Sequence, residues 1–257
     1  MGETVIQVSS LGKRIKGKTI LEDISFEINK GDCVALIGPN GAGKTVLMSC
    51  ILGDKKPSSG QVLIDGKAGK AKNKIAVLLQ ENTIPNSLKV EELIAFFQSI
   101  SDNPLTNQEV QDLLQFKEDQ YQQFADKLSG GQRRLLAFVL FLIDKPKILF
   151  LDEPTAGMDT STRQRFWEIV NDLKKAGTTI LYSSHYIEEV EHTADRILVL
   201  HQGKLIRDTT PYAMRHEEKE KQVTLPSSFV SIVHGLPDIY EITEKRDVIS
   251  FMTKAIE

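Results

Sequence analysis

The chain has 257 residues, of which 40% are hydrophobic and 26% are charged, as in a globular protein with a sizeable core. Its formal net charge is -3 at pH 7. Because the chain lacks the excess positive charge typical of nucleic-acid-binding proteins, a nucleic-acid partner is not expected. The longest apolar run, residues 135–143, is shorter than the ~20 residues that a membrane span requires. Because both cysteines lie in apolar segments, we expect a cytoplasmic protein in a reducing compartment.

The first third of the chain alternates between strand-like segments and turns. Strands are predicted at residues 4–11, 20–28, 32–38, 60–67 and 74–80. Residues 12–18 are the expected turn between the first two strands. The third strand is a short apolar run that ends at glycines, and a helical segment follows it.

The middle of the chain changes character, because residues 88–145 carry apolar residues at helical spacing. Strands and helices then alternate again, which predicts a mainly parallel sheet. The predicted elements are a strand at 147–154, a helix at 160–177, a strand at 178–185, a short helix at 186–195 and a hairpin at 196–206. Thr160 or Ser161 is expected to cap the helix at 160–177, and Gly177 to end it.

The last segment, residues 211–257, differs in composition from the rest of the chain. It opens with a charged stretch at 214–221, and the residues that follow predict a small βαβ unit. We therefore expect two domains, residues 1–210 and a C-terminal extension at 211–257.

A phosphate-binding loop is predicted at residues 38–45, "GPNGAGKT", which fits G-x-x-x-x-G-K-[ST] between a strand and a helix. The glycines let the backbone approach phosphates, Lys44 reaches the β- and γ-phosphates, and Thr45 binds Mg²⁺. The predicted nucleotide-binding residues are Gly38, Pro39, Asn40, Gly41, Ala42, Gly43, Lys44, Thr45 and Val46.

An acidic pair follows the apolar segment "KILFLDEP" at 147–154. The predicted strand delivers Asp152 to the edge of the sheet that holds the phosphate loop, where it can hold Mg²⁺ through water. Glu153 is placed to accept a proton from an attacking water. A GTPase reading requires N-K-x-D, and "NKIA" at 73–76 lacks the aspartate. These motifs do not exclude a small-molecule kinase.

A second backbone phosphate site is predicted in "KLSGGQRR" at 127–134, where two glycines open an apolar helix. With "LSGGQ" matched at all five positions 128–132, residues 4–206 resemble the nucleotide-binding subunit of an ABC transporter. The resemblance implies an α/β P-loop NTPase core with a mainly parallel sheet and an antiparallel β subdomain. It also implies a helical insertion at about 81–145.

The resemblance assigns further residues and partners. It implies that Gln80 is the lid glutamine and a Mg²⁺ ligand, that Asp159 in "AGMD" contacts nucleotide, and that His185 is the catalytic switch histidine. It implies an ATPase whose two copies pack head to tail, so that one signature motif closes over the partner's ATP. The signature residues are Ser129, Gly130, Gly131 and Gln132.

One departure concerns the base-binding position, where the family commonly stacks an aromatic residue on adenine. The alignment places Ile15 there, which offers apolar contact without π-stacking. The tail at 211–257 resembles that of cassettes serving ABC-2 type exporters, which implies a separate transmembrane permease at the inner face of the membrane. The alternative is a soluble ABC ATPase of iron–sulfur assembly or of the ribosome. A DNA-repair ATPase is disfavoured, because no sustained heptads lie between the two phosphate sites.

Overall fold

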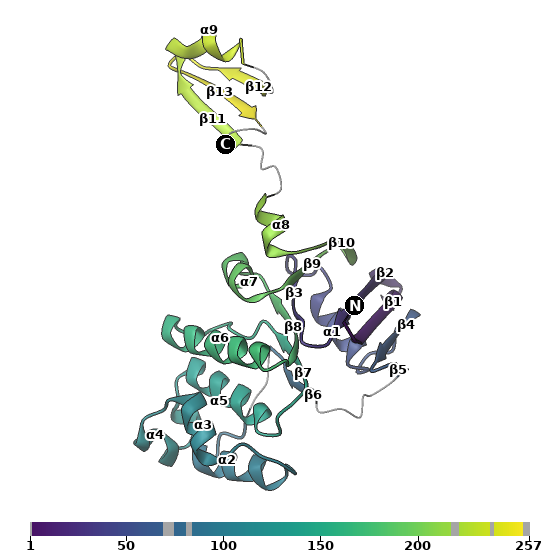
Figure 1. The fold of residues 1–257 in the computed structure, drawn as a ribbon, viewed down its shortest axis with the longest axis vertical. Helices are drawn as coiled ribbons and strands as arrows, with labels where there is room; N and C mark the ends of the chain where they lie inside the picture. Colours follow the sequence, from purple (N-terminus) through teal and green to yellow (C-terminus); the bar gives the residue numbers. More distant parts are fainter. Residues whose placement is uncertain (1, 69–74, 81–83, 217–220, 237–238, 254–257) are drawn as a thin grey trace. The chain divides into compact units, whose positions relative to one another are not determined.

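The computed structural model describes residues 2–68, 75–80, 84–216, 221–236 and 239–253. It divides into two compact units, Met1–Pro211 and Tyr212–Glu257 (Figure 1). Residues 217–220 of the charged stretch expected at 214–221 lie outside the described residues. Within those described ranges, no helix combines the length and apolarity needed to cross a membrane.

The first unit is built on a mainly parallel sheet, which confirms the predicted α/β class. From edge to edge its described strands are β10 (Lys204–Thr209), β9 (Arg196–His201), β3 (Cys33–Ile37), β8 (Thr179–Ser184), β7 (Ile148–Asp152) and β6 (Ile75–Leu78). β10 is the antiparallel edge strand, and the others run parallel. Every residue of β3, β7 and β8 is buried, as expected for a parallel sheet covered on both faces.

In Figure 1 this sheet lies between α1 (Lys44–Ile51) on one side and α6 (Thr160–Lys175) on the other. The predicted cap of α6 is wrong, because Asp159 is the N-cap and accepts a hydrogen bond from the Thr162 amide at 3.0 Å. The predicted end of α6 is confirmed, since Gly177 follows it with φ 87°. A left-handed residue at that position is the usual way to stop a helix.

A second, antiparallel sheet has the order β2-β1-β4-β5. Its strands are β1 (Thr4–Ile15), β2 (Lys18–Asn29), β4 (Ser59–Ile64) and β5 (Lys67–Ala68). The turn expected at 12–18 contracts to Lys16 and Gly17, whose φ angles of 48° and 80° suit a two-residue hairpin. Ile15 therefore ends a strand. The strand predicted at 60–67 is interrupted, because the chain reverses at Asp65–Gly66.

The helical insertion is observed as several short helices and one longer one. Its elements are α2 (Val90–Ser99), α3 (Asn107–Leu114), α4 (Glu118–Gln122), the 3-10 turn η1 (Ala125–Lys127) and α5 (Gly130–Leu142). Helix α3 ends at Leu114, because Gln115 adopts a left-handed φ of 52°. After β8, the short helix α7 (Ile187–Thr193) leads into the β9–β10 hairpin.

The second unit contains a small three-stranded sheet. α8 (Pro211–His216) spans the boundary and leads to β11 (Lys221–Pro226), η2 (Ser227–Phe229), α9 (Val230–Val233), β12 (Ile239–Glu244) and β13 (Val248–Thr253). The strand order is β11-β13-β12, with β13 antiparallel to both neighbours. β11 and β12 are therefore parallel to each other, and β13 lies between these two strands of the predicted βαβ unit. The core of the second unit centres on Val233, Ile249 and Phe251.

Candidate functional site

The phosphate loop joins the buried strand β3 to helix α1. Gly43 caps α1 with φ 106°, a left-handed conformation, and a Cβ there would lie 2.7 Å from Leu21 Cδ2. Only glycine fits such a position. The first N–H groups of a helix have no intrahelical acceptor, so the loop and the start of α1 offer backbone donors to an anion.

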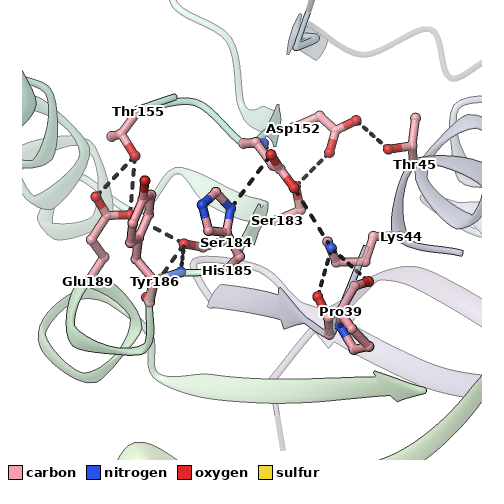
Figure 2. A network of polar contacts seen from close by, with 12 residues as sticks. Pro39, Lys44, Thr45, Asp152, Thr155, Ser183, Ser184, His185, Tyr186 and Glu189 are labelled. Carbon is pink, nitrogen blue, oxygen red and sulfur yellow. Dashed lines mark hydrogen bonds and ion pairs between the residues drawn. The ribbon is translucent and has the colours of Figure 1, made fainter. Parts of the chain in front are cut away.

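Lys44, the first residue of α1, is 6% exposed. Its ammonium donates to the Gly38 carbonyl at 2.8 Å and to the Pro39 carbonyl at 3.4 Å. The same nitrogen lies 3.8 Å from Glu153 Oε1. Figure 2 shows Lys44 folded against the loop from which it projects. A buried cation held mostly by neutral carbonyls fits a site that receives a polyanion.

Thr45 and Asp152 meet at the carboxyl edge of the parallel sheet, as predicted from their motifs. The Thr45 hydroxyl donates to Asp152 Oδ2 at 2.8 Å, and the Ser183 hydroxyl donates to Asp152 Oδ1 at 2.6 Å (Figure 2). Asp152 is 2% exposed. A hydroxyl and a buried carboxylate are hard oxygen donors, the kind that Mg²⁺ takes together with phosphate and water oxygens. The residues present therefore fit a magnesium ion bound with nucleotide.

Glu153 follows β7 in an unusual backbone conformation, with φ 44°. Non-glycine residues held in this region are strained by roughly 1–3 kcal/mol, and such strain clusters at functional sites. Its amide donates to the Ser183 hydroxyl at 2.9 Å. Its carboxylate lies between Lys44 and His185, with Oε2 3.6 Å from His185 Nδ1. A carboxylate held in this way can accept a proton from water.

His185 follows β8 and is held on one face by an aromatic ring. Its ring centroid lies 4.0 Å from that of Tyr186, and the Arg163 guanidinium lies 5.1 Å from the Tyr186 ring centroid. Arg163 Nε is also 3.6 Å from Glu189 Oε1. Tyr186, Arg163 and Glu189 could not be predicted as site residues from the sequence, because they belong to no recognisable motif.

Glu189 ties the loop after β7 to the end of β8. The Thr155 hydroxyl donates to its carboxylate at 3.0 and 3.2 Å, and the Ser184 hydroxyl donates at 3.3 Å. The Ser184 hydroxyl also accepts from the Tyr186 amide at 3.0 Å. The loops that carry Glu153 and His185 are therefore linked through Glu189 (Figure 2).

The signature motif, residues 128–132, forms the N-terminus of α5 with a reciprocal capping box. The Ser129 hydroxyl accepts from the Gln132 amide at 3.2 Å, and Gln132 Oε1 accepts from the Ser129 amide at 3.2 Å. Gly130 is exposed, and a Cβ on it would meet nothing within 4 Å. Gly131 is buried, and its Cβ position lies 3.3 Å from Asp159 Oδ2.

Asp159, predicted to contact nucleotide, is engaged as the cap of α6. Hydrogen bonds from the Ser161 hydroxyl and from the amide and hydroxyl of Thr162 hold the pKa of Asp159 well below its usual range. The structure places it beside the signature motif of its own chain.

Two further predicted residues, Gln80 and Ile15, are exposed. Gln80 stands two residues after β6, and its carbonyl accepts from Arg134 Nη1 at 2.8 Å. Ile15 pairs with Lys18 at the end of the β1–β2 hairpin and is 36% exposed.

Arg134 is the main residue that sequence reasoning missed, although it stands two positions after the signature motif. Its guanidinium donates to backbone carbonyls at the ends of β6 and β7. Burial lowers the pKa of Arg134, whereas the charges of Asp152 and Glu153 raise it.

Known proteins are similar to this chain in sequence and in fold. The family model described as "ABC transporter" matches residues 21–156. The probable multidrug ABC transporter ATP-binding protein YbhF of Escherichia coli K12 is 31% identical over 245 residues, covering 91% of this chain but only 42% of that protein. The Nod factor export ATP-binding protein I of Rhizobium johnstonii is 32% identical over 229 residues, covering 85% of this chain and 73% of that protein.

A solved structure is also similar. It is CbiO1 of Clostridium perfringens, described as part of the ABC transporter complex CbiONQ. The TM-score is 0.72 at 26% sequence identity, and the match covers 84% of this chain and 92% of that one. Sequence and fold therefore point to the same family.

Proposed function

Because this chain belongs to the ABC transporter family, we propose that it is an ATP-hydrolysing subunit that powers transport through a separate membrane-spanning subunit. The observation that carries the proposal is the cluster of Lys44, Thr45, Asp152, Glu153 and His185 at one edge of the parallel sheet. Ligands of α/β folds bind at this edge, where the strands end.

In the proposed reaction, Lys44 and the N–H groups of the phosphate loop bind and orient the phosphates of ATP. Thr45 and Asp152 would hold Mg²⁺, which when bound supplies positive charge to the phosphate oxygens. Glu153 accepts a proton from the attacking water. His185, 3.6 Å from the Glu153 carboxylate, orients that carboxylate and the terminal phosphate. Tyr186 and Arg163 keep the His185 ring in place.

We further propose that two copies pack head to tail, so that the signature motif of one closes over the ATP held by the other. Gly130 at the start of α5 is exposed and unobstructed, and a helix N-terminus attracts phosphate. This arrangement explains why one chain carries two phosphate-binding motifs. ATP then stabilises the dimer, and hydrolysis removes that stabilisation, which can drive a bound partner.

Export is the direction that the relatives favour. The two sequence relatives described above are named for multidrug transport and for Nod factor export. We propose the same direction here, with the membrane subunit selecting the cargo and this chain bound at the cytoplasmic face. The soluble-ATPase alternative is not favoured by these relatives.

The dock for the membrane subunit is proposed in the segment after Gln80, about residues 81–106, of which 81–83 lie outside the described residues. Helix α2 exposes Phe96 at 54%, and Ile100, the residue that caps the C-terminus of this helix, is 66% exposed. Exposed apolar groups next to each other mark interaction surfaces.

Phe96→Glu should therefore stop export by the assembled transporter. ATP turnover by the isolated chain should stay within about twofold of the parent rate, since substitutions at exposed positions hardly change the free energy of unfolding. Ile206→Glu is the matched control, because Ile206 is similarly exposed, at 60%, but lies on the edge strand β10. Export by the assembled transporter and ATPase activity of the isolated chain, measured for both variants, test the proposed dock. Equal loss of both in the Phe96 variant points to misfolding and contradicts the proposed dock.

A further inference from the structure

We propose that Arg134 is a positioning residue that holds the catalytic edge of its own chain and thereby couples the signature helix α5 to Glu153. The inference rests on the proposed function, because it concerns the same ATP site. Arg134 itself touches backbone carbonyls, so its action on the reaction passes through the residues that it holds.

The contacts of Arg134 match the donors of a guanidinium group. An arginine side chain carries five N–H donors in a rigid planar fork, and five carbonyl oxygens surround it here. The acceptors are Pro154 for Nε at 2.5 Å, Gln80 and Leu79 for Nη1 at 2.8 and 3.3 Å, and Glu153 and Asp152 for Nη2 at 3.1 and 3.2 Å.

Most of these carbonyls lie beyond the ends of the strands. The Glu153 carbonyl also accepts from the Ala156 amide at 3.2 Å. β6 stops at Leu78 and β7 stops at Asp152, so the ladder that pairs backbone groups inside the sheet is lost beyond those points. Glu153 is also held at φ 44°, a conformation that persists only where the surroundings enforce it. Arg134 bonds to the carbonyls on both sides of Glu153 and to its own, and therefore holds this peptide.

The position of Arg134 in α5 gives the contact a second consequence. It stands four residues after Gly130, about one turn along the same helix. In the proposed dimer, each α5 then meets two ATP sites: the partner's through Gly130, and its own through Arg134 and Glu153. A movement of α5 when the partner's ATP is bound would be transmitted to the carboxylate of its own site.

The first test replaces Arg134 by Met and uses Arg133→Met as the control, because Arg133 Nη1 donates instead to Asn86 Oδ1 at 3.2 Å. We expect Arg134→Met to lower kcat by about 10²-fold, the effect of misplacing a reacting group by about 1 Å. The Kd for ATP should stay within about twofold, since the phosphate loop is untouched. Arg134→Lys should recover only part of kcat, because three donors cannot replace a planar fork of five.

A measurement without nucleotide keeps this test independent of the proposed function. Hydrogen–deuterium exchange of residues 79–80 and 152–156 should accelerate in Arg134→Met and stay unchanged in Arg133→Met. Unchanged exchange there, or a fall in ATP affinity as large as the fall in kcat, overturns the positioning role. If the parent chain itself does not hydrolyse ATP, the proposed function fails, whereas the exchange result still decides the role of Arg134.

The second test asks in which chain Arg134 acts, using dimers of two differently tagged protomers. In the first dimer, one protomer carries Arg134→Met and the other carries Glu153→Gln, so the active Glu153 shares a chain with the replaced arginine. In the second dimer, both substitutions lie in one protomer. The first should hydrolyse ATP about 10²-fold more slowly than the second. Equal rates, or a slower second dimer, overturn the inference.

Discussion

Lys44→Ala should reduce Mg²⁺-dependent ATP turnover to near background, a fall of roughly 10²–10³-fold or more, as for the loss of one preorganised electrostatic contact. Lys44 is buried beside the loop carbonyls and Glu153, so no other described cation replaces it at that point. Binding of ATP should weaken as well, because Lys44 is proposed to contact the phosphates both before and during the reaction.

The control for this prediction is Lys175→Ala, which removes an exposed lysine at the end of α6. It should leave turnover unchanged. Circular dichroism and thermal unfolding show whether the Lys44 variant is folded. Robust turnover by folded Lys44→Ala protein contradicts the assignment of residues 38–45 as the phosphate loop.

Glu153→Gln should lower ATP hydrolysis by roughly 10²–10⁴-fold, the usual contribution of a positioned general base. Glutamine keeps the shape of the side chain but cannot take the proton of the attacking water. ATP binding should be retained, because Lys44, Thr45 and Asp152 are unchanged. Single-turnover hydrolysis and the binding of a fluorescent ATP analogue measure the two effects separately.

Glu168→Gln provides the matched control for this substitution, since Glu168 is an exposed carboxylate on α6. It should hydrolyse ATP at the parent rate. If Glu153→Gln also retains the parent rate, the proton acceptor lies elsewhere and the proposed role of Glu153 is wrong.

The parts of the site that could be predicted are those that short motifs encode. The spacing of the glycines and the lysine at position 44 predict a phosphate loop. An apolar strand that ends in two acidic residues predicts that Asp152 and Glu153 lie beside this loop. Parallel strands bring their carboxyl ends to one edge, so motifs about 100 residues apart in sequence could be expected to meet. The 2.8 Å contact between Thr45 and Asp152 follows from that rule.

The parts that could not be predicted depend on distant backbone. Arg134 looks like a surface residue after the signature motif, and its partners lie 18–20 and 54–55 positions away. Asp159 is predicted only as a nucleotide contact, whereas the structure shows it as the cap of α6. The local sequence leaves open which of three neighbouring polar residues caps this helix. The hairpin at Lys16–Gly17 is tighter than expected because both residues accept left-handed φ angles.

The most direct test of the head-to-tail account is the mass of Glu153→Gln protein in solution with ATP and with ADP. The account predicts a dimer with ATP and a monomer with ADP, because hydrolysis no longer removes the terminal phosphate that joins the two copies. Adding Gly130→Asp should abolish the dimer while each monomer still binds ATP. The open space at Gly130 accepts the new side chain, but its charge repels the partner's phosphate. A double variant that still dimerises with ATP contradicts the account.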